Sequence, residues 1–490
     1  MESLHDLEVL IESKKTNLVV IETEQEGCFI EGFNRLAAKS RTAYFHWTVT
    51  KGLLRLGEGY SHQSHNRDIN QLFAQIQSTS FPSVYILVDF HHFLTDPVAI
   101  RHVKDALVNN PEHTIVMLSS SVDLPEDLRQ KAIHYELPLP TQKQLKEVVN
   151  QLAARWYQEN NIKVKTSNKR IAKRLVENLC GLSINDAKRL AEHAIFNDGI
   201  ICQKDIVEIN QEKFELLNKD NVLSYELDYE ELDNIAGFDN LKEWLDVRRK
   251  VFSGELKLPG NDIPKGMLLL GVQGCGKSLA AKAVAGSWHL PLLYLDFGAL
   301  YNRYIGQTEE NMRSALTVAE HMSPCVLWID EIEKGLSAVS TNDDISKRLL
   351  GTFLTWLAEN KSKVFVVATA NDVTALPPEL MRKGRFDEVF FVDLPTETER
   401  AKILKVHLAR RDLSSDEIDV GLVAQACDGF SGAEVEQMVV SAIYDTYAKN
   451  EAISTELLLK KAQTTRPLSI LMAEKIQGLR SWAEHRTVRV

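Results

Sequence analysis

The run from Gly271 to Ser278 constrains this chain more than any other segment. It reads Gly-Val-Gln-Gly-Cys-Gly-Lys-Ser and matches the pattern G-x-x-x-x-G-K-[ST]. We expect an apolar strand over 267–270 before it and a helix from 279 onward after it. Glycines let backbone N–H groups turn inward around an anion at a helix N-terminus, where the helix dipole favours negative charge. The segment therefore predicts a phosphate-binding loop and a nucleotide site.

Each residue of this loop has an expected role. Lys277 should reach the β- and γ-phosphates, and Ser278 should hold Mg²⁺. Cys275 leaves two interpretations open, a redox-sensitive thiol beside a helix N-terminus or a small residue tolerated in the loop, and we favour the second. The remaining residues expected to surround the phosphates are Gly271, Gly274, Gly276 and Leu279.

Composition limits the class of protein. The 490 residues suffice for two to four domains, and 44% apolar with 26% charged residues is ordinary for a globular protein. The net charge of −11 argues against duplex nucleic acid as the main partner. No apolar run approaches the ~20 residues that span a bilayer, and the N-terminus lacks a secretory pattern. The six scattered cysteines fit a reducing compartment, so we expect the cytoplasm.

Two carboxylates follow a buried strand downstream of the loop. The apolar run over 324–329 is typical of a parallel strand covered on both faces, and it ends at Asp330 and Glu331. Asp330 is placed to hold the Mg²⁺ shell, and Glu331 to polarise a water for attack on the γ-phosphate. The alternative, a helix-capping turn, is weak, and the 53 positions from Lys277 to Asp330 leave room for one βα unit.

Further downstream, a polar amide and two arginines stand near the same sheet. Asn371 ends an apolar strand over 364–370 and is a candidate to orient the attacking water, although Asn also ends strands for its turn preference alone. Arg382 and Arg385 flank a glycine turn. They are either solvated surface residues or arginine fingers that neutralise charge on the transferring phosphoryl group.

The order of these motifs resembles the AAA ATPases, specifically the classical clade. The resemblance implies ATP as ligand, Asn371 as sensor, and Arg382 and Arg385 acting on the nucleotide of a neighbouring protomer. It further implies adenine contacts from two segments, one before the loop, in which Asn234 stands where the clade has Asp, and one in the helical lid. The residues carried over for these contacts are Ile235, Gly237, Gly432 and Ala433.

A segment after the strand expected over 292–297 resembles the clade's first pore loop. Its aromatic–aliphatic–glycine triplet is Tyr304, Ile305 and Gly306. In the clade such a triplet grips extended polypeptide. An aromatic residue beside an aliphatic one fits a core position equally well, so the role of Tyr304 rests on its placement.

The first half of the chain repeats the second without its catalytic residues. The strand expected over 83–88 precedes Asp89, and Phe90 takes the place of Glu331. Where the loop would lie, the segment Glu22–Phe29 has one glycine, no lysine and three acidic residues, which would repel a nucleotide. An unrelated α/β domain of similar periodicity is the alternative.

The predicted fold is therefore α/β, with two tandem AAA-type P-loop NTPase-like modules. Each would be a parallel sheet sandwiched by helices with a small helical lid. The expected boundaries are a degenerate module at 1–215 with its lid at about 141–215, a linker at 216–229, an active core at 230–396, and a lid with a C-terminal helix at 397–490.

The tandem as a whole resembles the conserved hypothetical reading-frame AAA protein of cyanobacteria and algal plastid genomes. The resemblance implies cytoplasm or plastid stroma and a link to photosynthetic physiology. The leading hypothesis is an ATP-hydrolysing homo-oligomer, expected as a hexamer, that remodels a protein client with ATP and Mg²⁺. The alternative is an ATP-dependent switch or scaffold in which the inactive half docks a partner. No N-K-x-D motif for GTP and no H-E-x-x-H peptidase motif occurs.

Overall fold

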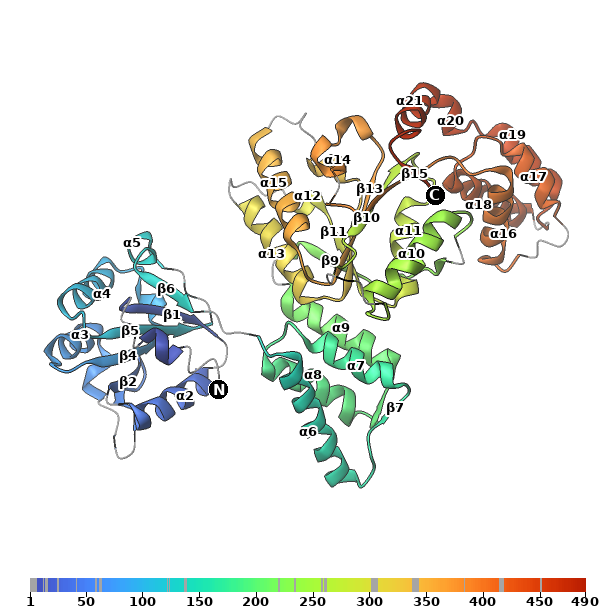
Figure 1. Cartoon of the computed structure of the whole chain (residues 1–490). Helices are drawn as coiled ribbons and strands as arrows, with labels where there is room; N and C mark the ends of the chain where they lie inside the picture. Colours follow the sequence, from blue (N-terminus) through green and yellow to red (C-terminus); the bar gives the residue numbers. More distant parts are fainter. Residues whose placement is uncertain are drawn as a thin grey trace. The chain divides into compact units, whose positions relative to one another are not determined.

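The computed structural model divides the chain into two compact units, residues 1–138 and 139–490. Helices α6–α9, which the sequence assigns to the first half, lie in the second unit (Figure 1). The structure describes the whole chain except residues 1–6, 12, 14–15, 24–25, 41, 58–59, 61–63, 121, 123, 136–138, 219–220, 233–234, 257–258, 260–261, 301–306, 337–342, 383, 414–417 and 450–451.

The first unit is a sheet covered by helices on both faces. Its strands are parallel apart from β3, and they run in the order β3-β2-β4-β5-β1-β6. Every residue of β4 and β5 is buried, as expected for central strands covered on both faces. The strands are β1 (Leu18–Glu22), β2 (Ala43–Thr48), β3 (Gly52–Arg55), β4 (Ser83–Val88), β5 (Thr114–Ser119) and β6 (Ala132–Tyr135). The helices are α2 (Glu26–Lys39), α3 (Ile69–Ser78), α4 (Pro97–Asn109) and α5 (Glu126–Arg129).

The second unit is built around a sheet in the order β15-β14-β10-β13-β12-β11-β9, parallel except for β9. The strands are β9 (Leu223–Glu226), β10 (Gly266–Gly271), β11 (Leu292–Leu295), β12 (Cys325–Ile329), β13 (Val364–Ala370), β14 (Glu388–Val392) and β15 (Val488–Arg489). The helices around it are α10 (Asp239–Phe252), α11 (Lys277–Trp288), α12 (Phe297–Leu300), α13 (Gln307–His321), α14 (Ile332–Leu336) and α15 (Asp343–Glu359).

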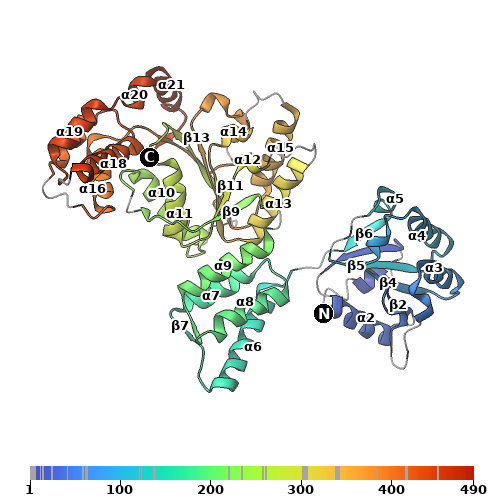
Figure 2. The same ribbon diagram turned by 180° about the vertical axis from the view of Figure 1, so that it is seen from behind.

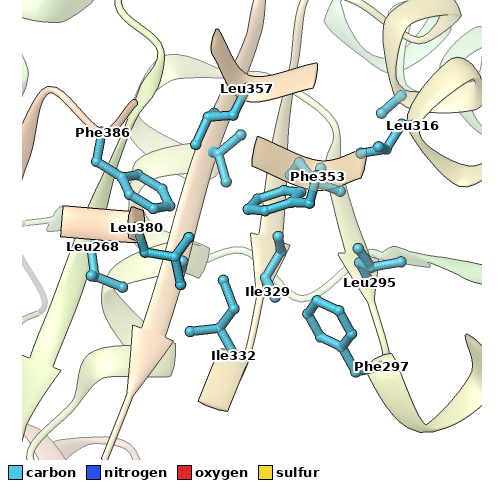
Figure 3. Packing of buried hydrophobic residues seen from close by; sticks show 14 of the residues in the cluster. Leu268, Leu295, Phe297, Leu316, Ile329, Ile332, Phe353, Leu357, Leu380 and Phe386 are labelled. Atoms are coloured by element: carbon cyan, nitrogen blue, oxygen red, sulfur yellow. The ribbon is translucent and has the colours of Figure 1, made fainter. Parts of the chain in front are cut away.

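Alternate side chains of these strands build two apolar clusters, one on each face of the sheet. Leu268 and Ile329 point to the face covered by α12–α15, where Phe353 of α15 lies over Ile329 (Figure 3). Met267 and Val326 belong to the cluster under α10 and α11. The sheet is thus the middle layer of three, which confirms the predicted α/β class.

Both sheets contain the same arrangement of five parallel strands. When the edge strands β3, β9 and β15 are set aside and the other five strands of each sheet are numbered along the chain, both sheets have the order 5-1-4-3-2. The left-handed residue beyond the third strand is Asp89 (φ 54°) in one sheet and Glu331 (φ 49°) in the other, each seven positions after a proline. Hydrogen bonding nevertheless aligns Asp89 with Asp330, because Ser119 donates to Asp89 Oδ1 at 2.7 Å as Thr369 donates to Asp330 Oδ1, and Phe90 then follows in the place of Glu331.

A helical segment precedes the second sheet within the same unit. It consists of α6 (Gln142–Asn160), α7 (Lys169–Leu179), α8 (Ile184–Phe196) and α9 (Gln203–Leu217), with a two-stranded β7 (Lys165–Thr166) and β8 (Ile200–Ile201). The stretch 216–229 was expected as a linker, but it contains the edge strand β9. Phe214 of α9 packs on Tyr225 of β9 with ring centroids 5.5 Å apart, and burial of these rings draws the stretch onto the sheet.

After the sheet, the lid consists of α16 (Glu397–Ala409), α17 (Val420–Ala426), α18 (Gly432–Lys449) and α19 (Thr455–Thr464). The short α20 (Leu468–Leu471) and α21 (Ala473–Ala483) then return to the sheet, seen from behind in Figure 2. Among the described residues, no helix is long and apolar enough to cross a membrane.

A buried ammonium lies where the helical segment meets the second sheet. Lys213 of α9 is only 1% exposed, and it donates to the Cys180 carbonyl at 2.5 Å. Burial lowers the pKa of Lys213 to about 8, opposed by the nearby thiols of Cys180 and Cys325. The pKa of Lys213 in the unfolded chain is about 10.5, so at pH values between about 8 and 10.5 folding releases this proton. Stability attributable to Lys213 therefore rises with pH across that window.

We therefore expect the free energy of unfolding to rise less between pH 8 and 10 in Lys213→Met than in the wild type, because the variant lacks this titrating group. The measurement is urea unfolding by tryptophan fluorescence at pH 7, 8, 9 and 10. Lys204→Met is the control, because Lys204 lies on the same helix and its side chain is 83% exposed. Equal pH dependence in wild type and Lys213→Met would contradict the prediction.

Candidate active site

The phosphate-binding loop lies between the end of β10 and the start of α11. Gly271 has φ 148°, and a Cβ there would lie 1.9 Å from the Val392 carbonyl oxygen of the neighbouring β14. Gly276 caps α11 in the left-handed region with φ 89°. Only glycine fits the first position without moving a strand, and it is favoured at the second. The loop is thus held between two strands and a helix N-terminus.

Lys277 occupies the hollow of this loop. It is 6% exposed, and its ammonium donates to the carbonyls of Gly271 at 3.0 Å and Val272 at 2.8 Å. Burial lowers its pKa, while Cys275 and the nearby carboxylates oppose the shift. The loop carbonyls carry no net charge, so a bound anion would stabilise this buried cation strongly. The loop therefore suits a phosphate.

The carboxylate of Asp330 joins the loop to two strand ends. Ser278 donates its hydroxyl to Asp330 Oδ1 at 3.1 Å, and Thr369 of β13 donates to the same oxygen at 2.5 Å. Thr369 Oγ1 also accepts the backbone N–H of Glu331 at 3.0 Å. One threonine hydroxyl therefore fixes both acidic residues. Sequence reasoning missed Thr369, although its place two residues before Asn371 was a usable signal.

Glu331 and Asn371 contact one another directly. The Asn371 amide donates to Glu331 Oε1 at 2.8 Å, and Lys334, one turn into α14, forms an ion pair with the same carboxylate. Glu331 has a left-handed backbone, with φ 49°, just beyond the end of β12. The predicted base and the predicted sensor are therefore brought together by strands 40 positions apart.

Glu333 is a further residue that sequence reasoning missed. Its Oε1 accepts the backbone N–H of Asn371 at 2.8 Å, and its Oε2 has no hydrogen-bond partner within the part of the chain that the structure describes. Burial raises the pKa of Glu333, opposed by the hydrogen bond from Asn371. This carboxyl holds the main chain of Asn371 while Glu331 holds its side chain.

A cavity of about 410 Å³ lies between the loop, the two acidic residues and the lid. Its apolar lining includes Ile235 and Phe238, and also Ile403 and Val406 of α16. The predicted residues that line this cavity are Ile235, Gly274, Cys275, Gly276, Lys277, Ser278, Leu279, Asp330, Glu331, Asn371, Gly432 and Ala433. An apolar slot beside a phosphate loop suits a nucleoside base with its phosphates.

The lid also supplies charged groups at the cavity that the sequence did not reveal. His407, Arg410 and Glu436 line it, and Arg410 is paired with Glu230 at 2.7 Å. Burial lowers the pKa of His407, opposed by the Glu436 carboxylate. No motif marks these residues, because only their position on α16 and α18 brings them to the cavity.

Four other predicted residues stand apart from the cavity lining. Gly271 supports the loop from behind, and Gly237 packs against the Glu399 carboxylate. Arg382 is exposed, and Arg385 donates to the Glu379 carbonyl at 2.8 Å, so neither arginine reaches this cavity. Asn234 and the triplet Tyr304, Ile305 and Gly306 lie outside the described residues.

The oxygens of Ser278 and Asp330 fit Mg²⁺. They lie 3.1 Å apart at the open end of the loop, and hydroxyl and carboxylate oxygens are the hard ligands that Mg²⁺ takes alongside nucleotide phosphates and water. Among the described residues, no group of three or more His, Cys, Asp or Glu forms an all-protein metal cage. Burial raises the pKa of Cys275 to about 12, so its thiol stays protonated and fits a small residue tolerated in the loop.

Three family models match the chain. The ATPase family associated with various cellular activities (AAA) matches residues 267–394. The N-terminal domain of SpoVK-like AAA ATPases matches 3–137, and their second domain matches 143–220.

Some curated proteins match this chain over its whole length, and others match only part of it. The chain is 32% identical to the "Uncharacterized AAA domain-containing protein ycf46" of Pyropia yezoensis, over 99% of this chain and 98% of that protein. It is 33% identical to the protein of the same name from Guillardia theta, over 100% of this chain and 96% of that one. It is also 32% identical to the ATP-dependent zinc metalloprotease FtsH 2 of Salinibacter ruber, but only over 48% of this chain and 35% of that protein. With its loop, acidic pair and full-length relatives, the chain is an ATPase that belongs to the AAA family, in the group of ycf46 AAA domain-containing proteins.

Proposed function

We propose that this chain is a homo-oligomeric ATPase that uses hydrolysis to remodel a protein client. The observation that carries the proposal is the position of Arg382 and Arg385. Both lie on the turn after η5 (Pro378–Met381), outside the lining of the cavity that holds Lys277 and Glu331. A guanidinium that balances the charge of a transferring phosphoryl group must touch it. We infer that these arginines serve the nucleotide of a second copy.

Within one copy, the proposed roles follow from the contacts. Mg²⁺ and ATP supply the reacting phosphoryl group and neutralise part of its charge when bound. With ATP bound, the Lys277 ammonium would donate to phosphate oxygens in place of the loop carbonyls. Ser278 and Asp330 would hold the metal. Glu331 accepts a proton from the attacking water, and Asn371 fixes the direction of that carboxylate through the bond at 2.8 Å.

The first unit supports a second candidate function, an ATP-dependent switch or scaffold. Glu22 at the end of β1 accepts the backbone N–H of Val122 at 2.9 Å, so a carboxylate stands where the second unit has its phosphate loop. The unit nevertheless keeps a complete sheet and its own core. A folded but inactive module fits a docking role, in which the nucleotide state of the second unit controls a partner.

The finer features of the proposal are a hexameric ring, ATP with Mg²⁺, a protein client without nucleic acid, and the cytoplasm or plastid stroma as compartment. A link to photosynthesis belongs with the plastid assignment. Tyr304 would contact the client from the central pore.

Hydrolysis should depend on the second unit alone. We expect Lys277→Ala to abolish ATP binding because it removes the cation of the loop. Glu331→Gln should bind ATP but turn it over about 100-fold more slowly, since water activation is lost. Calorimetric ATP binding and steady-state phosphate release measure the two effects. ATPase activity that survives Lys277→Ala would move the active site elsewhere.

Catalysis should need a neighbouring copy. Arg385→Ala and Lys277→Ala proteins, each inactive alone, should recover part of the activity when mixed. At a mixed interface an intact cavity of the first variant meets the intact arginine of the second. Phosphate release across a titration of mixing ratios measures the recovery, and light scattering shows that the two variants assemble together. No recovery in a mixture that co-assembles would rule out the trans role.

Client remodelling should depend on Tyr304. Tyr304→Ala is expected to leave basal ATPase within about threefold of wild type while abolishing unfolding of a client, because an aromatic ring grips by apolar contact and takes no part in phosphoryl transfer. If Tyr304 is a core residue, its truncation should instead cost about 3–5 kcal/mol and lower the Tm. A stable variant that still remodels its client would favour the switch hypothesis.

A further inference from the structure

The C-terminal segment, defined here as residues 467–490, contacts the cavity's surroundings at several points (Figures 1 and 2). Its first contact is with the lid. The backbone N–H of Leu468 donates to Glu434 Oε1 at 2.7 Å. The other oxygen of Glu434 accepts the N–H and the hydroxyl of Ser431, each at 2.8 Å. One carboxylate thus connects the segment to the turn that brings Gly432 to the cavity.

A second contact ties α21 to the strand beside the phosphate loop. Arg480 grips the Asp393 carboxylate with two nitrogens, at 2.8 and 2.9 Å. Asp393 directly follows β14, whose last carbonyl, that of Val392, accepts the N–H of Val272 in the loop at 3.0 Å. The segment ends as β15, which extends the sheet next to β14. This contact holds the edge of the sheet on which the loop rests.

The third contact involves the residue next to Asn371. Lys475 Nζ lies 3.0 Å from Asp372 Oδ2. The other oxygen of Asp372 accepts the N–H of Thr374 at 3.0 Å and its hydroxyl at 2.6 Å, which caps η4 (Val373–Ala375). Asp372 therefore links α21 to the main chain that runs from Asn371 toward the turn of Arg382 and Arg385.

We propose that Lys475 is a positioning residue for ATP hydrolysis, which holds Asn371 in place through Asp372. Asn371 is then held by Glu333 of α14 and by Glu331 beyond β12, and its neighbour Asp372 is held by Lys475 of α21. The inference rests on the proposed role of Asn371. A small displacement of this amide would misdirect Glu331, and misplacement of about 1 Å near reacting atoms can cost up to ~10²-fold in rate.

Stability and positioning are separable at this contact. The side chains of Lys475 and Asp372 are 44% and 32% exposed, and such ion pairs add little to folding stability. The apolar anchors of α21 are instead Ile476, Leu479 and Ala483, which belong to the two clusters of the sheet. Removing the ammonium should therefore leave α21 docked, while Asp372 keeps its bonds to Thr374 and loses its contact with α21.

The test uses the full-length protein. Lys475→Ala is expected to lower kcat for ATP by about tenfold, with KM, nucleotide affinity and Tm unchanged. Lys475→Arg should restore kcat because it keeps the cation. Lys460→Ala, an exposed lysine of α19, is the matched control for loss of one positive charge and should match wild type.

A double-mutant cycle decides whether Lys475 acts through Asn371. Asn371→Ala combined with Lys475→Ala should be no slower than Asn371→Ala alone, because the position of an absent amide has no effect. Independent, additive losses would overturn the inference, as would wild-type kcat in Lys475→Ala. An inactive wild type would instead contradict the ATPase assignment, and loss of both Tm and kcat in Lys475→Ala would show a structural role only.

Discussion

The arrangement of the site in the second unit depends on the carboxylate of Asp330, which accepts hydrogen bonds from the hydroxyls of Ser278 and Thr369. These three residues come from α11, the end of β12 and β13. A partly buried carboxylate is costly unless its lone pairs are satisfied, so the hydrogen bonds to Asp330 fix the relative positions of the loop and both strand ends. The order β10-β13-β12 makes it possible, because it places those carboxyl ends side by side.

The two units show how much of this fold is independent of its chemistry. They share a strand order, and Asp89 and Glu331 even share a left-handed conformation. The first unit has Glu22 bonded to a backbone N–H where the second has a buried lysine in a glycine loop. The same layers therefore surround a glycine loop with a buried lysine in one unit and a carboxylate in the other.

The segments outside the two sheets surround the site in less obvious ways. The helical segment packs its α9 on β9 through Phe214, and the C-terminal segment returns from the lid to the sheet edge. The helical segment buries Lys213, which donates to the Cys180 carbonyl. The C-terminal segment pairs Arg480 with Asp393, which is distant in the sequence. Such contacts make the lid, the loop and strand β13 parts of one packed body within the second unit.

The sequence by itself determined the phosphate loop, the strand that ends at Asp330 and Glu331, and the strand that ends at Asn371. Each is a local pattern, in which glycine spacing or a continuous apolar run reports the conformation of neighbouring residues. The tertiary structure alone decided that Thr369 joins the two acidic residues, that β9 replaces the expected linker, and that Lys475 meets Asp372. These depend on packing between elements distant in the chain, and single hydroxyls and ion pairs leave no periodic signal in a sequence.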